Sequence, residues 1–237
     1  MRTKYSPQNS VPTKLTTIGF IGGTGDLGTG IAIHLAKEYE ILLGSRSLEK
    51  AQAAVNTILT EKGNRDYLKR NLKPEENNKV VETCKIILLT VPHENAIETI
   101  KGLSTSFCGD QILISAVAPV VKVGKEFLSQ IDSSGKSVSQ QIAELVPKSV
   151  KIATAFQSVP AHILYEERPI SSDVLVTSDE LETYQKIAEI ISKIEGLRPL
   201  YLGTLNLSGE VERLTALVLN IAIKNKLKSP TPKFNSF

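Results

Sequence analysis

A glycine-rich stretch near the start of the chain has the residue types and spacing that suit phosphate binding. Residues 22–28 read GGTGDLG and contain a GxGxxG pattern at Gly23, Gly25 and Gly28. In this pattern the first glycine permits a tight turn, the second lets the backbone approach a pyrophosphate, and the third lets a helix pack against the preceding strand. The pattern follows one predicted strand and opens a helix, which favours a dinucleotide site over an ordinary glycine-rich turn.

The residues that follow the second predicted strand indicate which dinucleotide binds. A site that prefers NAD carries Asp or Glu there, to accept hydrogen bonds from the ribose 2′-hydroxyl. Here the sequence is Gly44-Ser45-Arg46-Ser47, with no acid. Arg46 can hold a 2′-phosphate with its planar guanidinium, Ser45 can donate a hydroxyl, and Lys50 one helical turn later adds a further positive contact. The pattern predicts NADP; a solvated surface arginine is the alternative.

Three X-Pro pairs come at or soon after the ends of predicted strands: Val91-Pro92, Ala118-Pro119 and Val159-Pro160. In an open α/β sheet the carboxyl ends of the strands form the edge where ligands bind. The side chains nearby are small or aliphatic, namely Ala116, Val117, Val120, Val159 and Ala161. X-Pro pairs also simply end strands. Three of them at one edge nevertheless favour a flat slot for ring systems.

The sequence offers little acid–base machinery. It contains no paired carboxylates, no GxSxG pattern and no compelling Ser/His/Asp set. Of the three histidines, we expect His93 to form a wall of the cleft, His34 to be packed or at the boundary of the core, and His162 to face either the cleft or solvent. Direct hydride transfer between two preformed cofactors needs no side-chain acid or base. We therefore assign no catalytic residue and no metal site.

The elements that must position these residues alternate between short β-rich runs and longer segments of helical period. The predicted strands span 15–21, 40–44, 85–91, 111–117 and 150–156, and the predicted helices span 27–38, 48–61, 94–103 and 138–145. Residues 63–79 are left as a connection. This alternation predicts an α/β fold of the Rossmann type, with a doubly wound, mainly parallel sheet.

The pattern changes toward the carboxyl end of the chain. We expect a strand at 173–176, a helix that runs to Glu195 behind a capping box of Thr177 and Glu180, a strand at 197–202 and a helix at 209–227. The predicted organisation is an NADP-binding domain at 15–176 and a small C-terminal α+β lobe at 177–228 that completes the cleft. Flexible tails are expected at 1–14 and 229–237.

The composition is that of an ordinary globular chain of 237 residues, with 41% hydrophobic and 22% charged residues. Two cysteines, Cys84 and Cys108, form no CxxC pair, so neither a disulfide-rich scaffold nor a Cys/His zinc site is expected. No apolar run reaches the roughly 18 residues of a membrane span. Residues 1–14 lack a hydrophobic signal core. We expect a soluble, cytoplasmic protein.

The net charge of +3 is concentrated at the two ends of the chain. Residues 1–14 and 224–237 carry seven basic residues and no acid, which leaves −4 for the rest. A groove for nucleic acid should lie on folded elements and not only on the chain ends. We expect small-molecule cofactors as partners, and neither nucleic acid nor a membrane.

On these residues the sequence resembles the NADPH-dependent reductases of the deazaflavin coenzyme F420. The resemblance covers about residues 15–226 and rests on the glycine loop and on 44–46 (GSR), 90–92 (TVP) and 159–161 (VPA). The stretches 194–200 (IEGLRPL) and 211–215 (VERLT) are more particular. The resemblance implies an F420-dependent NADP oxidoreductase that moves a hydride between nicotinamide C4 and deazaflavin C5, with the rings about 3–3.5 Å apart in a dry cleft.

Carried over by position, the resemblance also implies which residues bind each cofactor. Beside the fingerprint glycine Gly23, they are Thr24, Gly25, Asp26 and Leu27 for the pyrophosphate, Ser45, Arg46 and Lys50 for the 2′-phosphate, and His93, Ile97, Val120 and Ala161 around the nicotinamide. The deazaflavin is expected against Val159 and near Thr215. The chain departs from the expected pattern at Gln157, where some relatives carry histidine. A homodimer and an archaeal source are further implications.

Two other functions fit parts of the sequence. Pyrroline-5-carboxylate reductases share the glycine loop but end in a long all-helical dimerisation domain, whereas only about 60 residues follow Thr177 here and they include a predicted strand. Membrane-bound ferric reductases with a related nucleotide domain would need membrane spans. A non-enzymatic NADP-binding sensor would also lack acid–base residues. The small residues Val120, Val159 and Ala161 favour an open slot and therefore an enzyme.

Overall fold

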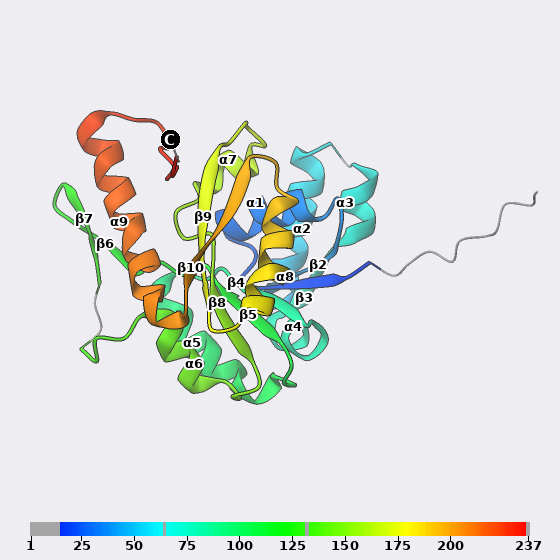
Figure 1. Ribbon diagram of the computed structural model, residues 1–237. Coiled ribbons are helices and arrows are strands. Elements are labelled where there is room, and N and C mark those ends of the chain that lie inside the picture. Colours follow the sequence, from blue (N-terminus) through cyan, green and yellow to red (C-terminus); the bar gives the residue numbers. More distant parts are fainter. Residues whose placement is uncertain (1–14, 64, 131–132, 236–237) are drawn as a thin grey trace, which may run out of the picture.

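The computed structural model describes residues 15–63, 65–130 and 133–235. Eight strands form one sheet in the order β10-β9-β8-β5-β4-β1-β2-β3, and β6 and β7 form a separate hairpin (Figure 1). The expected tail at 1–14 lies outside the described residues. Among the described residues, no helix is long and apolar enough to cross a membrane.

The bounds of the elements follow the predicted alternation over most of the chain. The sheet contains β1 (Thr17–Ile21), β2 (Glu40–Ser45), β3 (Leu72–Glu76), β4 (Ile86–Leu89), β5 (Ile112–Ser115), β8 (Lys151–Thr154), β9 (Ser172–Ser178) and β10 (Leu197–Gly203). The helices are α1 (Asp26–Leu35), α2 (Leu48–Glu61), α3 (Asp66–Asn71), α4 (Asn77–Thr83), α5 (His93–Leu103), α6 (Val138–Leu145), α7 (Ala161–Tyr165), α8 (Leu181–Ser192) and α9 (Ser208–Asn225). The hairpin strands are β6 (Val120–Val123) and β7 (Glu126–Ser129).

Helices cover both faces of the sheet, and each face has its own apolar core. In β1, Ile18 and Phe20 point toward the core shared with α1, α2 and α8, whereas Ile21 points toward the core shared with α4, α5 and α6. Strands that are buried on both faces read as continuous apolar runs. Residues 86–89 (IILL) of β4 have that form. The predicted Rossmann-type, doubly wound sheet is confirmed.

The order of the strands creates the crevice that binds ligands in this architecture. The chain runs outward from β1 to β2 and β3, and then returns to β4 on the other side of β1. All of these neighbours pair in parallel, so their carboxyl ends meet at one edge. The reversal of direction between β1 and β4 is a topological switch point, which is where open α/β sheets hold their ligands.

The segment at 63–79, which the sequence left as a connection, contains α3, β3 and α4. Strand β3 reads LKPEE and has a single apolar side chain at Leu72, so no strand period is visible in its sequence. Its position at the edge of the sheet tolerates Pro74, because an edge strand needs ladder hydrogen bonds on one side only. The failure to predict β3 affects the site, because the carboxyl end of β3 lies at the edge of the sheet where ligands bind.

The carboxyl-terminal strands extend the same sheet. Strand β9 pairs antiparallel with β8 and parallel with β10. The unit β9-α8-β10 is therefore a second parallel crossover, and its strands run opposite to β8 and the other strands of the sheet. The expected boundary between residues 176 and 177 falls inside β9. The predicted capping box is wrong: Thr177 lies in β9 with its hydroxyl 2.7 Å from that of Thr154, and α8 begins only at Leu181.

Helix α9 packs beside the hairpin, at the end of the molecule away from α2 and α3 (Figure 1). The Asn220 side chain accepts a hydrogen bond from the backbone N–H of Phe127 at 2.9 Å and donates one to its carbonyl at 2.6 Å. Lys224 and Glu126 add an ion pair at 3.1 Å. The hairpin was not predicted, and its backbone contact with α9 joins residues 93 positions apart in the chain.

The described part of the expected C-terminal tail, residues 229–235, has no helix or strand but is hydrogen-bonded to β9. The Asp173 N–H donates to the Pro232 carbonyl at 2.9 Å, and the Phe234 N–H donates to the Asp173 carboxylate. Arg198 binds the same buried carboxylate through two hydrogen bonds of 2.7 Å. These hydrogen bonds, that of Arg198 first, lower the pKa of Asp173 to about 2.

Candidate functional site

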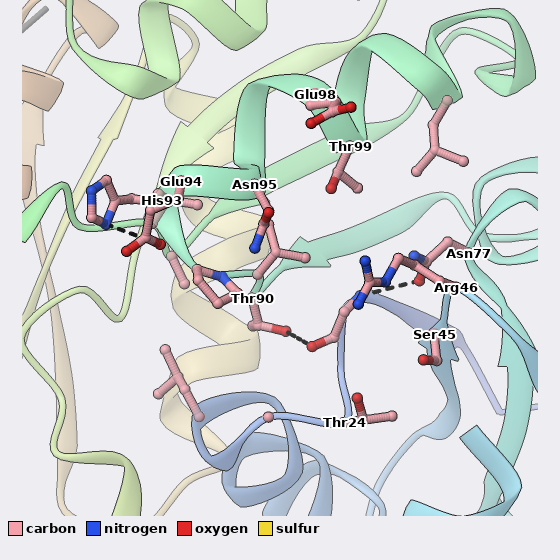
Figure 2. A pocket seen from close by; sticks show the side chains of 18 of the residues that line it. Thr24, Ser45, Arg46, Asn77, Thr90, His93, Glu94, Asn95, Glu98 and Thr99 are labelled. Atoms are coloured by element: carbon pink, nitrogen blue, oxygen red, sulfur yellow. Dashed lines mark hydrogen bonds and ion pairs between the residues drawn. The ribbon is translucent and has the colours of Figure 1, made fainter. Parts of the chain in front are cut away.

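A cavity of about 1060 Å³ lies at the carboxyl ends of β1, β2, β4 and β5 (Figure 2). Its walls are the glycine loop, the end of β2, the start of α4, and the segment that leads from β4 into α5. Eight residues predicted from the sequence line it: Thr24, Gly25, Asp26, Leu27, Ser45, Arg46, Lys50 and His93. The fold therefore brings the glycine loop and the Ser45-Arg46 pair to one cavity, as the dinucleotide interpretation requires.

The glycine loop is a sharp turn whose glycines differ in their tasks. Gly22 has a φ of +68°, and a Cβ there would lie 2.2 Å from the Val91 side chain, so the tight turn depends on Gly22 and not on Gly23 as predicted. Gly23 is buried, where a Cβ would lie 2.7 Å from Phe20. A Cβ on Gly25 would meet nothing within 4 Å, so the backbone at Gly25 is open to the cavity.

Side chains from neighbouring strand ends hold this loop in place. The Gly22 N–H donates to the Asn77 side-chain oxygen at 3.1 Å, and the Thr90 hydroxyl donates to the Gly22 carbonyl at 3.2 Å (Figure 2). Both side chains line the cavity, and neither was predicted as a site residue. Thr90 lies near the carboxyl end of the strand predicted at 85–91, which is a usable signal. No sequence signal pointed to Asn77, because the strand before it, β3, was not predicted.

Helix α1 begins at the loop and presents its N-terminus to the cavity. The residue before its first turn is Gly25, which has no side chain to cap the helix. The first N–H groups of a helix have no partners within it and carry the positive end of the helix dipole. Thr24 and Asp26 flank this point and line the cavity. The arrangement suits a phosphate group at the start of α1.

The positive charge of the cavity is confined to one end. Ser45 is buried at the end of β2, and Arg46 and Lys50 are exposed beside it. Among the described residues, Arg46 and Lys50 are the only Arg or Lys side chains that line the cavity. Neither forms an ion pair with another described residue. Both charges are therefore available to an anionic group of a ligand.

His93 lies on the other side of the view in Figure 2 from Ser45 and Arg46. One ring nitrogen is 3.0 Å from the Gln130 side-chain oxygen, and the other is 3.4 Å from the Glu94 carboxylate. His93 thus joins the start of α5 to the segment after β7. It also lines a second cavity of about 370 Å³, together with Ile97. The predicted role of His93 as a wall of the cleft agrees with this placement.

Five predicted site residues line neither cavity: Gly23, Val120, Val159, Ala161 and Thr215. Gly23 nevertheless lies between Gly22 and Thr24 of the first cavity, and Val120 follows Pro119 of the second. Val159 is buried in the turn after β8, and Ala161 begins α7, which packs on α1. The Thr215 hydroxyl donates to the Gln157 carbonyl at 2.9 Å, so α9 does reach the turn that carries Val159. The expected slot is therefore divided: Ala116 and Val117 line the first cavity, whereas Val120, Val159 and Ala161 line neither in this conformation.

The turn after β8 has two unusual features. Phe156 is fully buried with a φ of +74°, a left-handed conformation that is rare for an aromatic residue. Gln157 is 6% exposed and donates from its side-chain nitrogen to the Ser115 carbonyl at 2.8 Å. Its side-chain oxygen is buried without a hydrogen-bond partner in the described part of the chain. A buried acceptor left open in this way usually has a partner that the protein alone does not supply.

Helix α9 is fixed by a buried carboxylate that the sequence analysis did not single out. Glu212 accepts hydrogen bonds of 2.9 Å from the N–H groups of Val138 and Ser139, and one of 2.7 Å from the Ser139 hydroxyl. Burial raises its pKa, and these hydrogen bonds oppose that effect. Glu212 therefore ties α9, and with it Thr215, to the start of α6 at the second cavity.

The remaining histidines lie outside the first cavity. One ring nitrogen of His34 is 3.0 Å from the Leu164 carbonyl, and burial lowers the pKa of His34. His34 is thus packed, as predicted. His162 is exposed and lies 2.6 Å from the Ser229 hydroxyl. Among the described residues, no cluster of His, Cys, Asp and Glu could hold a metal ion.

The site is that of a Rossmann-type dinucleotide-binding protein. It combines a glycine loop at the topological switch point, the uncapped N-terminus of α1, and the positive charges of Arg46 and Lys50 at one end of the cavity. The family model "NADP oxidoreductase coenzyme F420-dependent" matches residues 17–119. The F420-dependent NADP reductase of Methanothermobacter marburgensis is 32% identical over 216 residues, which are 90% of this chain and 95% of that protein. That of Methanocaldococcus jannaschii is 29% identical over 215 residues, 89% of this chain and 94% of that protein. The chain belongs to the family of F420-dependent NADP reductases, and both of these relatives are archaeal.

Solved structures show the same architecture. A proposed F420 dependent NADP-reductase from Arthrobacter sp. FB24 has a TM-score of 0.75 at 14% identity, and the match covers 92% of this chain and 99% of that one. Glycerol-3-phosphate dehydrogenase from Coxiella burnetii has a TM-score of 0.58 at 20% identity, over 92% and 64% of the two chains. A pyrroline-5-carboxylate reductase from the same organism has a TM-score of 0.53 at 14% identity, over 79% and 59%. At these identities the likeness shows the fold alone.

Proposed function

We propose that this protein transfers a hydride directly between NADP(H) and coenzyme F420, with the two rings stacked beside the start of α5. As a member of its family it is an oxidoreductase that uses these two cofactors. The observation that supports the proposal most strongly is the cavity that combines the glycine loop with Ser45, Arg46 and Lys50.

The residues of the first cavity suit NADP at three points. The open backbone at Gly25 and the N-terminus of α1 would receive the pyrophosphate, with Gly23, Thr24, Asp26 and Leu27 shaping the loop. Arg46 and Lys50 would pair with the 2′-phosphate and Ser45 would donate its hydroxyl. The nicotinamide would then extend toward His93, where Ala116 and Ala118 leave room for a flat ring.

The second cofactor would lie where the two cavities meet. His93 and Glu94 line both cavities, so a ligand in one can contact a ligand in the other at this point. Of the predicted contacts, Ile97 lines the second cavity, and Val120 directly follows Pro119 in its wall. Val159, Ala161 and Thr215 line neither cavity, and we propose that they contact the deazaflavin once it is bound. The acceptor oxygen of Gln157 lies in the same turn as Val159, but it is buried and Gln157 lines neither cavity, so a bound ring would reach it only after the turn moves. Residues 177–228 contribute α9 to the proposed cleft.

The cofactors supply the chemistry, because a hydride moves from carbon to carbon between two conjugated rings. When NADPH reduces F420, nicotinamide C4 loses a hydride, deazaflavin C5 gains it, and the deazaflavin takes one proton from solvent. The protein's contribution is positional. Arg46 and the α1 N-terminus would hold the phosphates of NADP(H) and so position its nicotinamide, and the α9 side of the cleft would position the deazaflavin. Holding two reactants in a near-attack arrangement removes much of the entropic part of the barrier.

The test is anaerobic mixing of the purified protein with NADPH and oxidised coenzyme F420, while the visible absorbance of the deazaflavin is followed. We expect rapid bleaching with NADPH and little with NADH. If NADPH binds tightly but no bleaching occurs, the reductase proposal is wrong and an NADP-binding sensor is the better description.

We also propose that the protein forms a homodimer through α9. Leu217 and Ile221 on this helix are 57% and 42% exposed, and Val123 and Leu128 of the neighbouring hairpin are 56% and 48% exposed. Exposed apolar groups gathered on one side of a molecule commonly mark an interface. Light scattering after size-exclusion chromatography should give the mass of a dimer, and Leu217→Glu should shift it to the mass of one chain.

A further inference from the structure

An acidic side chain lies at the cationic end of the first cavity. Glu76 ends β3, and its Cα pairs in register with that of Ser45 at the end of β2. Neighbouring strands lie about 4.8 Å apart, so Glu76 is one strand spacing from the residue that precedes Arg46. Glu76 lines the cavity together with Ser45, Arg46 and Lys50. The proposed 2′-phosphate position therefore has a carboxylate beside its two cations.

The charge of Glu76 is not neutralised within the described part of the chain. The side chain is exposed and forms no ion pair or hydrogen bond with a described residue. The hydrogen bond of 3.0 Å to the Glu75 carboxylate comes from the backbone N–H of Glu76 and leaves its carboxylate free. Arg46 lines the same end but does not approach Glu76 within ion-pair distance. A bound phosphate would therefore meet a full negative charge from β3 as well as the positive charges of Arg46 and Lys50.

We propose that Glu76 determines how strongly the site discriminates between NADP(H) and NAD(H). Its carboxylate repels a 2′-phosphate, whereas it can accept a hydrogen bond from the 2′-hydroxyl of NAD(H). Arg46 favours the phosphate and Glu76 limits that preference. The inference rests on the proposed function, because it takes the Arg46 end of the cavity as the 2′-phosphate site.

Glu76→Gln removes the charge and keeps the size of the side chain. At a solvated surface, two unit charges about 8 Å apart change a binding constant by about two- to threefold, and a phosphate monoester carries nearly two charges. We therefore expect NADPH to bind about three- to tenfold more tightly to the variant, and NADH to bind equally or more weakly. The gain should shrink at high ionic strength, because salt screens exposed charges.

The measurement is a titration of NADPH and of NADH that follows cofactor fluorescence, with wild-type protein, Glu76→Gln and Glu195→Gln. Glu195 is an exposed acid after α8 that lines neither cavity, so Glu195→Gln matches the change in net charge and should leave both affinities unchanged. The inference is overturned if Glu76→Gln leaves the NADPH-to-NADH ratio within twofold of wild type, or if it weakens NADPH binding. Arg46→Ala tests the 2′-phosphate site separately. If Arg46→Ala leaves the NADPH affinity unchanged, the proposed 2′-phosphate site is wrong, whatever the result for Glu76→Gln.

Discussion

Removal of the Arg46 guanidinium tests the cofactor assignment most directly. The side chain is exposed and has no ion-pair partner among the described residues, so Arg46→Ala should change the free energy of unfolding by no more than about 0.5 kcal/mol. A hydrogen bond to a charged group contributes roughly 1.5–3 kcal/mol. Because Arg46 is exposed, we expect its contribution to NADPH binding to lie toward the lower value. NADPH affinity should therefore fall about ten- to hundredfold.

NADH has no 2′-phosphate, and its affinity for Arg46→Ala should remain within about twofold of wild type. Titrations that follow cofactor fluorescence give both dissociation constants under the same conditions. Arg168→Ala is the matched control, because Arg168 is an exposed arginine outside both cavities that pairs with Glu166 at 3.2 Å. The NADPH loss should be smaller at high ionic strength, since exposed charges are screened.

Equal losses for NADPH and NADH would refute the assignment, because they would place Arg46 against a part of the cofactor that both share. No loss for either would mean that the guanidinium stays solvated. Lys50→Ala adds a graded comparison: Lys50 is a point charge without the planar fork, so its removal should cost less than the removal of Arg46.

Three further predictions address the glycine loop, the proposed deazaflavin cleft and the C-terminal segment. Gly25→Ala should keep the fold, because a Cβ there meets nothing within 4 Å, yet weaken NADPH and NADH alike by about tenfold or more in the same titration; unchanged binding would separate Gly25 from the pyrophosphate. Thr215→Trp should block F420 turnover while NADPH affinity stays unchanged, and retained turnover would exclude α9 from the cleft. Asp173 has its pKa lowered to about 2, so its stabilising effect is present above about pH 4 and lost as the pH falls toward 2. Chemical denaturation should show that wild type loses about 2 kcal/mol more than Asp173→Asn over that range; an identical pH profile in the variant would contradict the assignment.

The dinucleotide site was predictable because its main parts are local in the chain. The glycine loop, α1, β2 and the Ser45-Arg46 pair lie within residues 17–46, where a strand, a turn and a helix follow one another directly. The phosphate-binding geometry depends on these short connections. The division of tasks among the glycines was wrong: Gly22 has a φ of +68°, and a Cβ there would lie 2.2 Å from the side chain of Val91, which follows β4. The sequence pattern alone does not show this contact.

Strand β3 shows where local patterns fail. Its five residues contain one apolar side chain and a proline, and they form a strand because the free edge of β2 accepts them. The consequence is chemical as well as topological. An acid that is absent from the end of β2 in the sequence is supplied by Glu76 from β3, beside Ser45.

The sequence by itself determined the class of fold, the phosphate-binding loop and the cationic pair at the end of β2, because the buried apolar strands and the glycine spacing encode them within short segments. Only the tertiary structure decided which distant residues meet. Thr215 and Gln157 are 58 positions apart, and Gly22 and Asn77 are 55 apart. Such contacts depend on sheet order and on how α9 packs, and these are set by the sum of many burial and hydrogen-bonding terms that no single segment of the chain contains.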